Sequence, residues 1–551
     1  MPSRFFNCSV IVCAFLVLLS SCAQIVPPTG GKQDMRPPFA RKYIPDSAAV
    51  HFHSKTVEIQ FDEYILLKDI GTQLVISPPM EKTPIIRARN KTLYIEFREP
   101  LKDSTTYTMN FGTAIQDLHE NNPLTNFRYI FSTGSFVDSL SLNGQVTNAL
   151  THSPEKGVLV MLYDKVDDSI PYKKLPAYFA KTDERGNYRI TNIKKGTYKA
   201  FALKDANGNY KFNEGEPIGF RAEPITLKNK DTADFLLFRQ PAEVQRLKRG
   251  ALQGYGRIGL VFNKRVEGLR LTPLNFSFGE GARIYTEQSS GGDTITYWFS
   301  SPKVDSIILE VSDKDRVYDT LRYKLISREK VLAQRKGQKA SLVLKSNASK
   351  GMLDLDSPIT FESDVPMLEL DHIPSSKFIL REDTAKKNIA PGGQMHYLVK
   401  ENDQRFFSWK DTTHVLKENG KYHLLILPGA FKDMFGFIND TIRYNFSLRE
   451  LKYYGTLKLN LHAPAGTYVM QLLDEQDGIV REAQPGGQKE LYFEYLPPGK
   501  YHMRLVYDAN KNGRWDSGDY SKHLQPEQVI YNTQPITIRS NWDQEVDWFV
   551  K

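Results

Sequence analysis

The chain has 551 residues, which corresponds to about three to five domains of ordinary size. Hydrophobic residues make up 40% and charged residues 25% of it, so the chain can build folded cores and is not disordered or fibrous. The formal net charge is +9, from 73 Lys and Arg against 64 Asp and Glu. These charges are interspersed, which argues against a nucleic-acid-binding groove.

The N-terminus carries the pattern of an export signal. Residues 5–19 form an apolar stretch behind Arg4, short enough to suit a signal-peptide core better than a membrane span. Leu19-Ser20-Ser21-Cys22 follows and resembles the bacterial lipobox, in which the cysteine is lipidated and becomes the mature N-terminus. We therefore predict a lipoprotein signal peptide over residues 1–21 and a lipid on Cys22. The alternative is an ordinary secretory signal cleaved near Ala23.

All the cysteines lie in the predicted signal peptide or directly after it. The only three are Cys8, Cys13 and Cys22. Two of them leave with the predicted signal peptide and the third carries the lipid, so the mature chain has no free thiol and no disulfide. Cysteine catalysis, thiolate metal sites and disulfide stapling are thereby excluded.

The remainder of the chain predicts an all-β protein. Residues 22–45 are rich in Pro and Gly and are expected to be an extended linker. Beyond them, residues 57–61, 92–97 and 107–111 alternate between apolar and polar side chains, which is the pattern of half-buried strands. Many short strands separated by turn residues indicate tandem β-sandwich domains.

Two types of internal repeat organise these strands. The first opens with a strand that ends in Phe, followed by a polar triplet and a branched residue, and occurs at residues 61–65, 262–266 and 361–365. The second runs from a Gly through a Tyr-containing strand to an Asp nine residues later, at residues 196–205 and 499–508. Each copy of the second type has similar strands before and after it.

The two repeat types resemble known domain families. The opening Phe61-Asp62-Glu63 and the core strand Thr106-Tyr107 to Phe111-Gly112 resemble the bacterial Ig-like domain of S-layer proteins. The segment at residues 27–34 (PPTGGKQD) and the exit at residues 131–134 (FSTG) resemble the Ig-like-domain lipoproteins of Bacteroidetes-type bacteria. The run from Asp183 through Gly186 and Tyr188 to Tyr198 resembles the transthyretin-like, carboxypeptidase-regulatory-type sandwich. The later copy keeps Gly499 and Tyr501 but replaces the Asp-x-x-Gly turn. These resemblances imply a fold and leave the activity open.

The resemblances imply five domains behind the linker. They are Ig-like at 46–136, transthyretin-like at 137–240, Ig-like at 248–328, Ig-like at 338–450, and transthyretin-like at 452–551.

Two loops rich in Asp and Asn are the candidate metal sites. Calcium takes six to eight oxygen ligands, and a loop with side-chain oxygens at positions one, three and five can wrap the ion. The predicted ligands in the later loop are Asp508, Asn510, Asn512, Asp516 and Asp519, with Gly513 at the sharp turn. Those in the earlier loop are Asp205, Asn207, Asn209 and Glu216. Tyr210 stands where Gly is expected, and either loop can instead be a plain turn held by its own side chains.

No catalytic motif is recognised in the sequence. We therefore expect a non-enzymatic cell-envelope lipoprotein with a structural or adhesive role, stabilised by weakly bound calcium. It would be attached by its lipid to the outer membrane, on a face that the sequence leaves open, with an envelope protein or glycan as partner and no nucleic acid. The alternatives are a carbohydrate-binding accessory protein of a glycan-uptake system and a hydrolase whose site is assembled from distant residues.

Overall fold

The computed structural model describes residues 34–550 except 126, 290, 301–303, 315, 326–340, 371–372, 374, 384–387, 390–395, 400–403, 412–415 and 488. The predicted signal peptide over residues 1–21 and Cys22 therefore lie outside the described residues. Within the described part, no helix is both long and apolar enough to cross a membrane.

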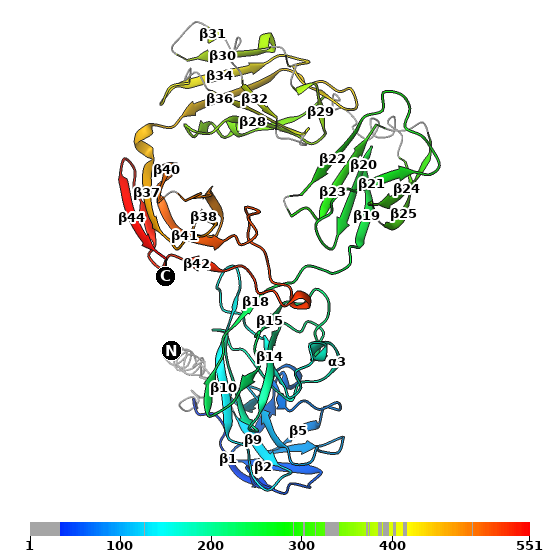
Figure 1. Cartoon of the computed structure of the whole chain (residues 1–551), viewed down its shortest axis with the longest axis vertical. Helices are drawn as coiled ribbons and strands as arrows, with labels where there is room; N and C mark the ends of the chain where they lie inside the picture. The colour runs from blue at the N-terminus through cyan, green and yellow to red at the C-terminus, as the bar shows by residue number, and fades with distance from the viewer. Residues whose placement is uncertain are drawn as a thin grey trace, which may run out of the picture. The chain divides into compact units, whose positions relative to one another are not determined.

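The described residues are almost entirely β-structure, as predicted (Figure 1). Helix within them is limited to α2 (Ile70–Gln73), α3 (Ile170–Lys173) and short 3-10 turns. The 3-10 turns are η1 (Asn347–Lys350), η3 (Ser375–Lys377), η4 (Leu451–Tyr453) and η5 (Tyr520–Lys522).

The chain forms two compact units. The first unit contains residues up to 146, 154–211 and 223–235, and the second contains residues 147–153, 212–222 and 236–551. The segment predicted as one domain at 137–240 is therefore divided between the two units.

The first sandwich, residues 40–132, lies in the first unit. Its strands are β1 (Ala40–Ile44), β2 (Thr56–Phe61), β3 (Ile65–Leu67), β4 (Val75–Ser77), β5 (Ile85–Arg89), β6 (Thr92–Glu96), β7 (Thr106–Asn110), β8 (Ile115–Asp117) and β9 (Arg128–Ser132). One sheet has the order β1-β2-β6-β5, the other β4-β7-β9, and β3 pairs with β8. Val57, Ile59 and Leu93 point into the shared core, and their neighbours in the strands are more exposed, which confirms the period-two pattern.

The predicted linker over residues 22–45 is wrong at its C-terminal end. Ala40–Ile44 forms β1, which pairs antiparallel with β2. Ala40 is buried, and the Tyr43 ring stacks on Tyr129 with 6.2 Å between ring centroids. The Pro and Gly content of the segment hid this strand, because the apolar side chains that anchor it are few.

The second sandwich, defined by residues 140–232, is built in the first unit from two sheets. They have the orders β13-β10-β17 and β12-β11-β14, with β16 pairing to β14. The strands are β10 (Leu140–Asn148), β11 (Leu159–Tyr163), β12 (Tyr178–Lys181), β13 (Asn187–Ile193), β14 (Thr197–Leu203), β16 (Ile225–Thr226) and β17 (Lys230–Thr232). Two further strands are β15 (Ile218–Phe220) and β18 (Phe235–Leu237).

The third sandwich, residues 247–325, lies in the second unit. Its sheets have the orders β19-β20-β23-β22 and β21-β24-β25 around one apolar cluster. The strands are β19 (Leu247–Gly254), β20 (Arg257–Phe262), β21 (Arg270–Pro273), β22 (Ile284–Gln288), β23 (Thr294–Phe299), β24 (Ser306–Ser312) and β25 (Val317–Lys324).

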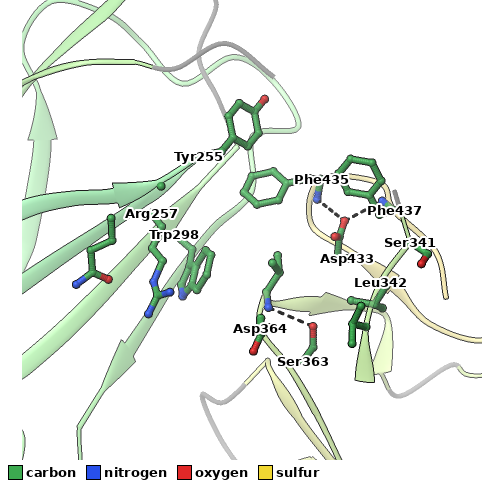
Figure 2. A pocket seen from close by; sticks show the side chains of 14 residues that line it. Tyr255, Arg257, Trp298, Ser341, Leu342, Ser363, Asp364, Asp433, Phe435 and Phe437 are labelled. Atoms are coloured by element: carbon green, nitrogen blue, oxygen red, sulfur yellow. Dashed lines mark hydrogen bonds between the residues drawn. The ribbon is translucent and has the colours of Figure 1, made fainter. Parts of the chain in front are cut away.

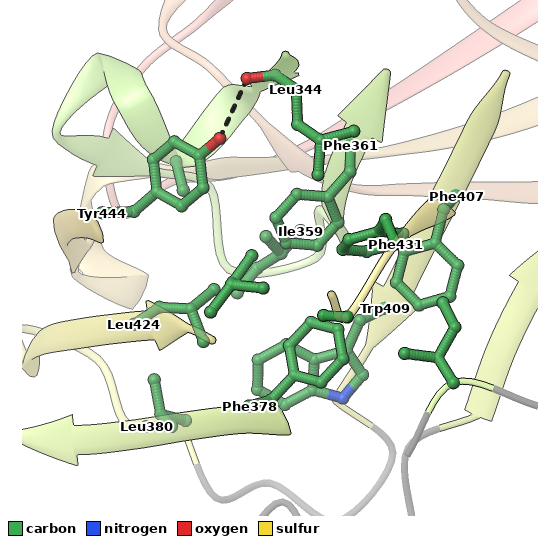
Figure 3. Close-up of a cluster of buried hydrophobic side chains, with 14 of the residues drawn as sticks. Leu344, Ile359, Phe361, Phe378, Leu380, Phe407, Trp409, Leu424, Phe431 and Tyr444 are labelled. Carbon is green, nitrogen blue, oxygen red and sulfur yellow. Dashed lines mark hydrogen bonds between the residues drawn. The ribbon is translucent and has the colours of Figure 1, made fainter. Parts of the chain in front are cut away.

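The fourth sandwich, residues 342–448, has an aromatic core (Figure 3). Phe361, Phe407 and Phe431 are each at most 1% exposed, with 5.5 Å between the ring centroids of Phe407 and Phe431. Its sheets have the orders β26-β28-β33-β32 and β27-β36-β34-β30-β31, and β29 pairs with β35. The strands are β26 (Leu344–Ser346), β27 (Met352–Leu353), β28 (Ile359–Ser363), β29 (Met367–Leu368), β30 (Phe378–Glu382), β31 (Asn388–Ile389), β32 (His396–Val399), β33 (Phe406–Lys410), β34 (Lys421–Ile426), β35 (Lys432–Asp433) and β36 (Ile442–Leu448).

The fifth sandwich, residues 455–549, has the orders β40-β37-β44 and β39-β38-β41-β42, with β43 pairing to β41. The strands are β37 (Gly455–His462), β38 (Tyr468–Leu473), β39 (Ile479–Ala483), β40 (Glu490–Leu496), β41 (Gly499–Tyr507), β42 (Val529–Tyr531), β43 (Ile536–Ile538) and β44 (Asp543–Phe549).

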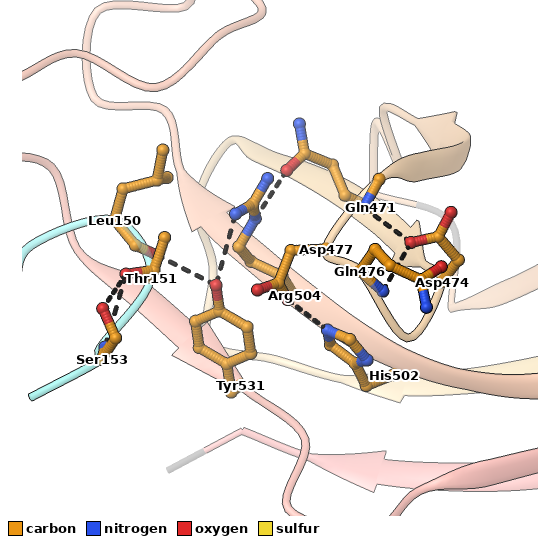
Figure 4. A network of polar contacts seen from close by, with 11 residues as sticks. Leu150, Thr151, Ser153, Gln471, Asp474, Gln476, Asp477, His502, Arg504 and Tyr531 are labelled. Atoms are coloured by element: carbon orange, nitrogen blue, oxygen red, sulfur yellow. Dashed lines mark hydrogen bonds and ion pairs between the residues drawn. The ribbon is translucent and has the colours of Figure 1, made fainter.

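Three segments from residues 147–153, 212–222 and 236–240 pack on the fifth sandwich within the second unit. The Tyr531 hydroxyl donates to the Leu150 carbonyl oxygen at 3.1 Å and accepts from buried Arg504, as Figure 4 shows. The Phe220 ring lies 5.1 Å from that of Tyr520, centroid to centroid. These contacts explain why the predicted domain at 137–240 does not coincide with one unit.

The repeats inferred from the sequence are present as recurring contacts. The hydroxyl of Tyr107 accepts from the N–H of Lys102, and the hydroxyl of Tyr422 accepts from that of Lys417, five residues upstream in both cases. In the second and fifth sandwiches, the matching Tyr198 and Tyr501 each donate to a carbonyl oxygen four residues upstream. Each Tyr hydroxyl ties its strand to the loop that precedes it.

Candidate functional site

The later Asp/Asn loop leaves the end of β41 and is organised by Asp508. This carboxylate is 2% exposed and accepts hydrogen bonds from the backbone N–H groups of Asn512 at 3.0 Å and Gly513 at 2.8 Å. Gly513 has a φ of 76°, in the left-handed region that glycine adopts at little cost. The first position and the glycine therefore form the sharp turn that the spacing predicts.

The structure also brings together three further predicted ligands. The side-chain amides of Asn510 and Asn512 both donate to the carboxylate of Asp516. The oxygens of these two amides accept from backbone N–H groups, at 3.1 Å for Asn510 and 3.0 Å for Asn512. Each amide has a donor end and an acceptor end, so a rotation of its side chain exchanges the group that faces the centre of the loop.

Asp519, the predicted ligand at position twelve, makes its contacts with the short 3-10 turn that follows the loop. It is the N-cap of η5 and accepts from the N–H and hydroxyl of Ser521 and from the Lys522 ammonium. Burial alone would raise the pKa of Asp519, but these hydrogen bonds outweigh it and hold the pKa below its usual value.

Sequence reasoning missed Glu527, which lies eight residues beyond the predicted loop. Its carboxylate accepts from the backbone N–H groups of Ala509 at 2.8 Å and Asp516 at 2.9 Å. One carboxylate thus ties the beginning of the loop to its end. No spacing rule identifies this residue, because only the path of the chain back to β42 places it there.

The earlier loop repeats the turn around Asp205. Its carboxylate accepts from the N–H groups of Gly208 and Tyr210, both at 2.8 Å. Tyr210 has a φ of 58°, so a tyrosine adopts the left-handed conformation for which glycine was expected. Its ring packs on Phe179 with 5.0 Å between ring centroids, and this packing offsets the backbone cost.

The other predicted ligands of the earlier loop have local partners. Asn207 accepts from the N–H of Asn209 at 3.0 Å, and Asn209 accepts from that of Lys211 at 2.7 Å. Glu216 is 6% exposed and accepts from the N–H of Asn213 at 2.9 Å. In the described part of the chain, no three side chains among His, Cys, Asp and Glu are grouped so that they could hold a metal ion.

A second site, which sequence reasoning also missed, lies between the third and fourth sandwiches. In β23, Ile295, Tyr297 and Phe299 point into the core of the third sandwich. Trp298 therefore points to the opposite face, yet it is only 2% exposed. It is covered because it packs with Leu368 and other apolar residues of the fourth sandwich.

Polar and aromatic contacts hold this joint together. The Nε of Arg405 lies 2.7 Å and 2.9 Å from the two carboxylate oxygens of Glu287, and both side chains are largely buried. The Tyr255 ring meets the Phe435 ring edge-on at 4.8 Å between centroids. The two sandwiches are therefore joined by a charge pair and an apolar cluster.

A cavity of about 260 Å³, open to solvent, lies at the joint and is shown in Figure 2. The guanidinium of Arg257 lies over the Trp298 ring, 4.9 Å from its centroid, on paired positions of β20 and β23. Asp433 accepts from the backbone N–H groups of Phe435 and Phe437, at 2.9 Å and 2.8 Å. The cavity thus combines aromatic walls with a cation and a buried carboxylate.

Comparison with known proteins identifies one of the domains. Residues 34–133 match the bacterial Ig-like domain. This segment includes the whole of the first sandwich, so the expected fold is confirmed there. Among curated proteins, none matches this chain.

Solved structures of several kinds align with the chain at low similarity, each with a TM-score of 0.14. The major pilin subunit of Bacillus cereus is 10% identical, over 75% of this chain and 99% of the pilin. The S-layer protein SbsC is 10% identical, over 90% of this chain and 66% of that chain. The L,D-transpeptidase from Mycobacterium smegmatis is 14% identical, over 30% of this chain and 79% of the enzyme. At these TM-scores, the alignments carry no argument about function.

Proposed function

We propose that the protein is a non-enzymatic lipoprotein of the bacterial cell envelope, acylated at Cys22, with a structural or adhesive role. The observation that carries the proposal is the order of the segments along the chain. A lipobox-like segment precedes a bacterial Ig-like domain at residues 34–133, and further β-sandwiches follow. A lipid at Cys22 would tether this series of domains to a membrane. The residue after the lipidated cysteine is Ala23 and not Asp, which by the enterobacterial sorting pattern favours the outer membrane.

The packing between domains supports a scaffold. The third and fourth sandwiches are joined by the Arg405–Glu287 pair and by the cluster around Trp298. Such joints limit bending between neighbouring domains, because bending would separate a largely buried charge pair and expose apolar surface. A chain of this kind can hold a binding surface at a distance from its anchor.

Metabolic labelling with an alkynyl palmitate tests the anchor. The full-length chain should incorporate the label and fractionate with outer membranes, and Cys22→Ser should lose both properties. Treatment of intact cells with protease then reports which face of the membrane carries the protein. An unlabelled wild-type chain released into the medium would overturn the proposal.

We also propose that the Asp508 loop binds calcium weakly, with a structural role. The support is that Asp508, Asn510, Asn512 and Asp516 converge in one turn. Rotation of the two amides would turn four side-chain oxygens toward a cation, and Glu527 lies next to them to hold the loop closed. The Asp205 loop offers the same turn with three such side chains.

A further inference from the structure

Two residues that line the cavity between the third and fourth sandwiches each carry a buried hydrogen-bond donor without an acceptor. The donors are the indole Nε1 of Trp298 and the Nε of Arg257, and both atoms are buried. A buried donor left without a hydrogen bond costs about 1–3 kcal/mol, so native proteins satisfy nearly all of them. Two such donors on adjacent strands, beside a cavity, indicate a group that supplies acceptor oxygens.

Three polar side chains that line the cavity already have hydrogen-bond or charge partners. Asp433 accepts from two backbone N–H groups, and Ser363 accepts from the N–H of Val365 at 3.1 Å. The carboxylate of Asp364 is paired with Lys345 at 2.9 Å. The two buried donors find no acceptor among these three groups, and a ligand that brings acceptor oxygens, such as a carboxylate, would satisfy them.

The shape and lining of the cavity narrow the class of ligand. A volume of about 260 Å³ is just below the range of about 300–1,000 Å³ usual for ligand pockets, which suits a single ring with small substituents. Tyr255, Trp298 and Phe435 provide aromatic faces and edges against which a ring can pack. Backbone N–H groups hold the carboxylate of Asp433, so the Arg257 guanidinium can pair with a carboxylate of the ligand in favourable two-point geometry.

We propose that this cavity binds the uronic acid unit of an acidic glycan, with its carboxylate on Arg257 and Trp298 and its ring against Tyr255 and Phe435. This assignment goes beyond a scaffold role, because it gives the scaffold a ligand. It depends only on contacts within the second unit and is independent of the lipid at Cys22.

Binding also requires a local rearrangement. The Arg257 guanidinium lies over Trp298, and both orphan donors are inaccessible in this arrangement. The carboxylate reaches them when the guanidinium rotates off the indole ring and closes on the ligand. The environment of Trp298 changes in that step, so tryptophan fluorescence reports binding.

The test is a titration of the soluble chain from Ala23 onward with galacturonic acid and its dimer, followed by tryptophan fluorescence and calorimetry. Galactose, which has the same ring and no carboxylate, is the matched neutral probe. We expect saturable binding of the uronates, with galactose at least about tenfold weaker because it lacks the charge-assisted pair.

Three variants locate the site. Arg257→Met keeps the length of the side chain, and Trp298→Phe keeps an aromatic ring without the N–H; each should weaken uronate binding about tenfold or more. Arg322→Met, at an exposed position of β25 in the same sandwich, should bind like the wild type. Thermal unfolding of each variant checks that it is folded.

Three results would overturn the proposal. They are no binding of either uronate up to about 10 mM, equal binding of galactose, and unchanged uronate binding by a folded Arg257→Met chain. If Trp298→Phe does not fold, Arg257→Met still decides the question, because Arg257 is only half-buried.

Discussion

The two Asp/Asn loops have the same turn and differ at two points. Both place an aspartate at the first position, whose carboxylate accepts from the N–H five residues later. Asp508 is buried whereas Asp205 is half-buried, and the sixth residue is Gly513 in one loop and Tyr210 in the other. The spacing therefore determines the turn. Burial sets how much its central carboxylate contributes, and side-chain packing can replace glycine at the strained position.

The two loops should differ most in the stability that is lost when the first aspartate is replaced. Asp508→Ala leaves the Gly513 N–H without its acceptor, and the Asn512 N–H keeps only the Asn510 oxygen. Because Asp508 is buried, we expect the change to destabilise the fifth sandwich by about 2 kcal/mol. Asp205→Ala should cost about 1 kcal/mol, because water can reach the half-buried site. Calorimetric unfolding measures the loss, and hydrogen exchange locates it in the loop.

Asp543→Ala, at an exposed position of β44, is the matched control and should unfold like the wild type. Equal losses for Asp205→Ala and Asp508→Ala would show that burial does not separate the two loops.

Two substitutions that remove the Tyr210 side chain separate the stability gained from its packing from the cost of its backbone strain. Tyr210→Ala removes the ring from Phe179 and should cost about 2 kcal/mol. Tyr210→Gly removes the same ring and should cost about 1 kcal/mol less, because glycine accepts a φ of 58° without strain. Thermal unfolding of the two variants side by side gives the difference. A glycine variant less stable than the alanine variant would contradict the assignment of strain.

The reciprocal change at Gly513 should have a smaller effect. Gly513→Ala places a Cβ at a φ of 76°, and that atom would lie 2.6 Å from the side-chain nitrogen of Gln484. The Gln484 side chain is flexible enough to move, so we expect a loss of about 1 kcal/mol from the backbone alone. Unfolding of Gly513→Ala in a Gln484→Ala background tests this, since removing the Gln484 contact should leave most of the loss unchanged.

The exposed pair of His423 and Asp383 should contribute least to the free energy of unfolding, and its contribution should depend on pH. The hydrogen bonds from His423 to Asn445 and Asp383 raise the pKa of His423 above its ordinary value. Because the pKa of His423 is higher in the folded state, protonation of His423 stabilises the folded chain at pH values below the ordinary histidine pKa. This stabilisation disappears as the pH rises through the pKa of the folded state. We expect under about 1 kcal/mol, because the pair is exposed. Unfolding at pH 5 to 8 should show the dependence, and His423→Gln should remove it.

Residue patterns predicted most of the fold. Alternation marked strands such as β2 and β6, and the recurring Tyr residues marked equivalent positions in the repeats. The strand β1 was missed because only a few apolar contacts anchor it. Of the candidate site, the turn around Asp508 followed from local spacing. Glu527 and the partners of Trp298 did not, because tertiary packing brings them there from distant parts of the chain.

The most direct test of the claim that these loops are ion-stabilised turns of an exported scaffold is calcium titration of the soluble chain from Ala23 onward. Calorimetry should give a dissociation constant of about 0.1–1 mM, with a rise in melting temperature that Asp508→Ala reduces and Asp543→Ala leaves intact. No heat and no change in melting temperature up to about 5 mM calcium, well above the expected range, would contradict it.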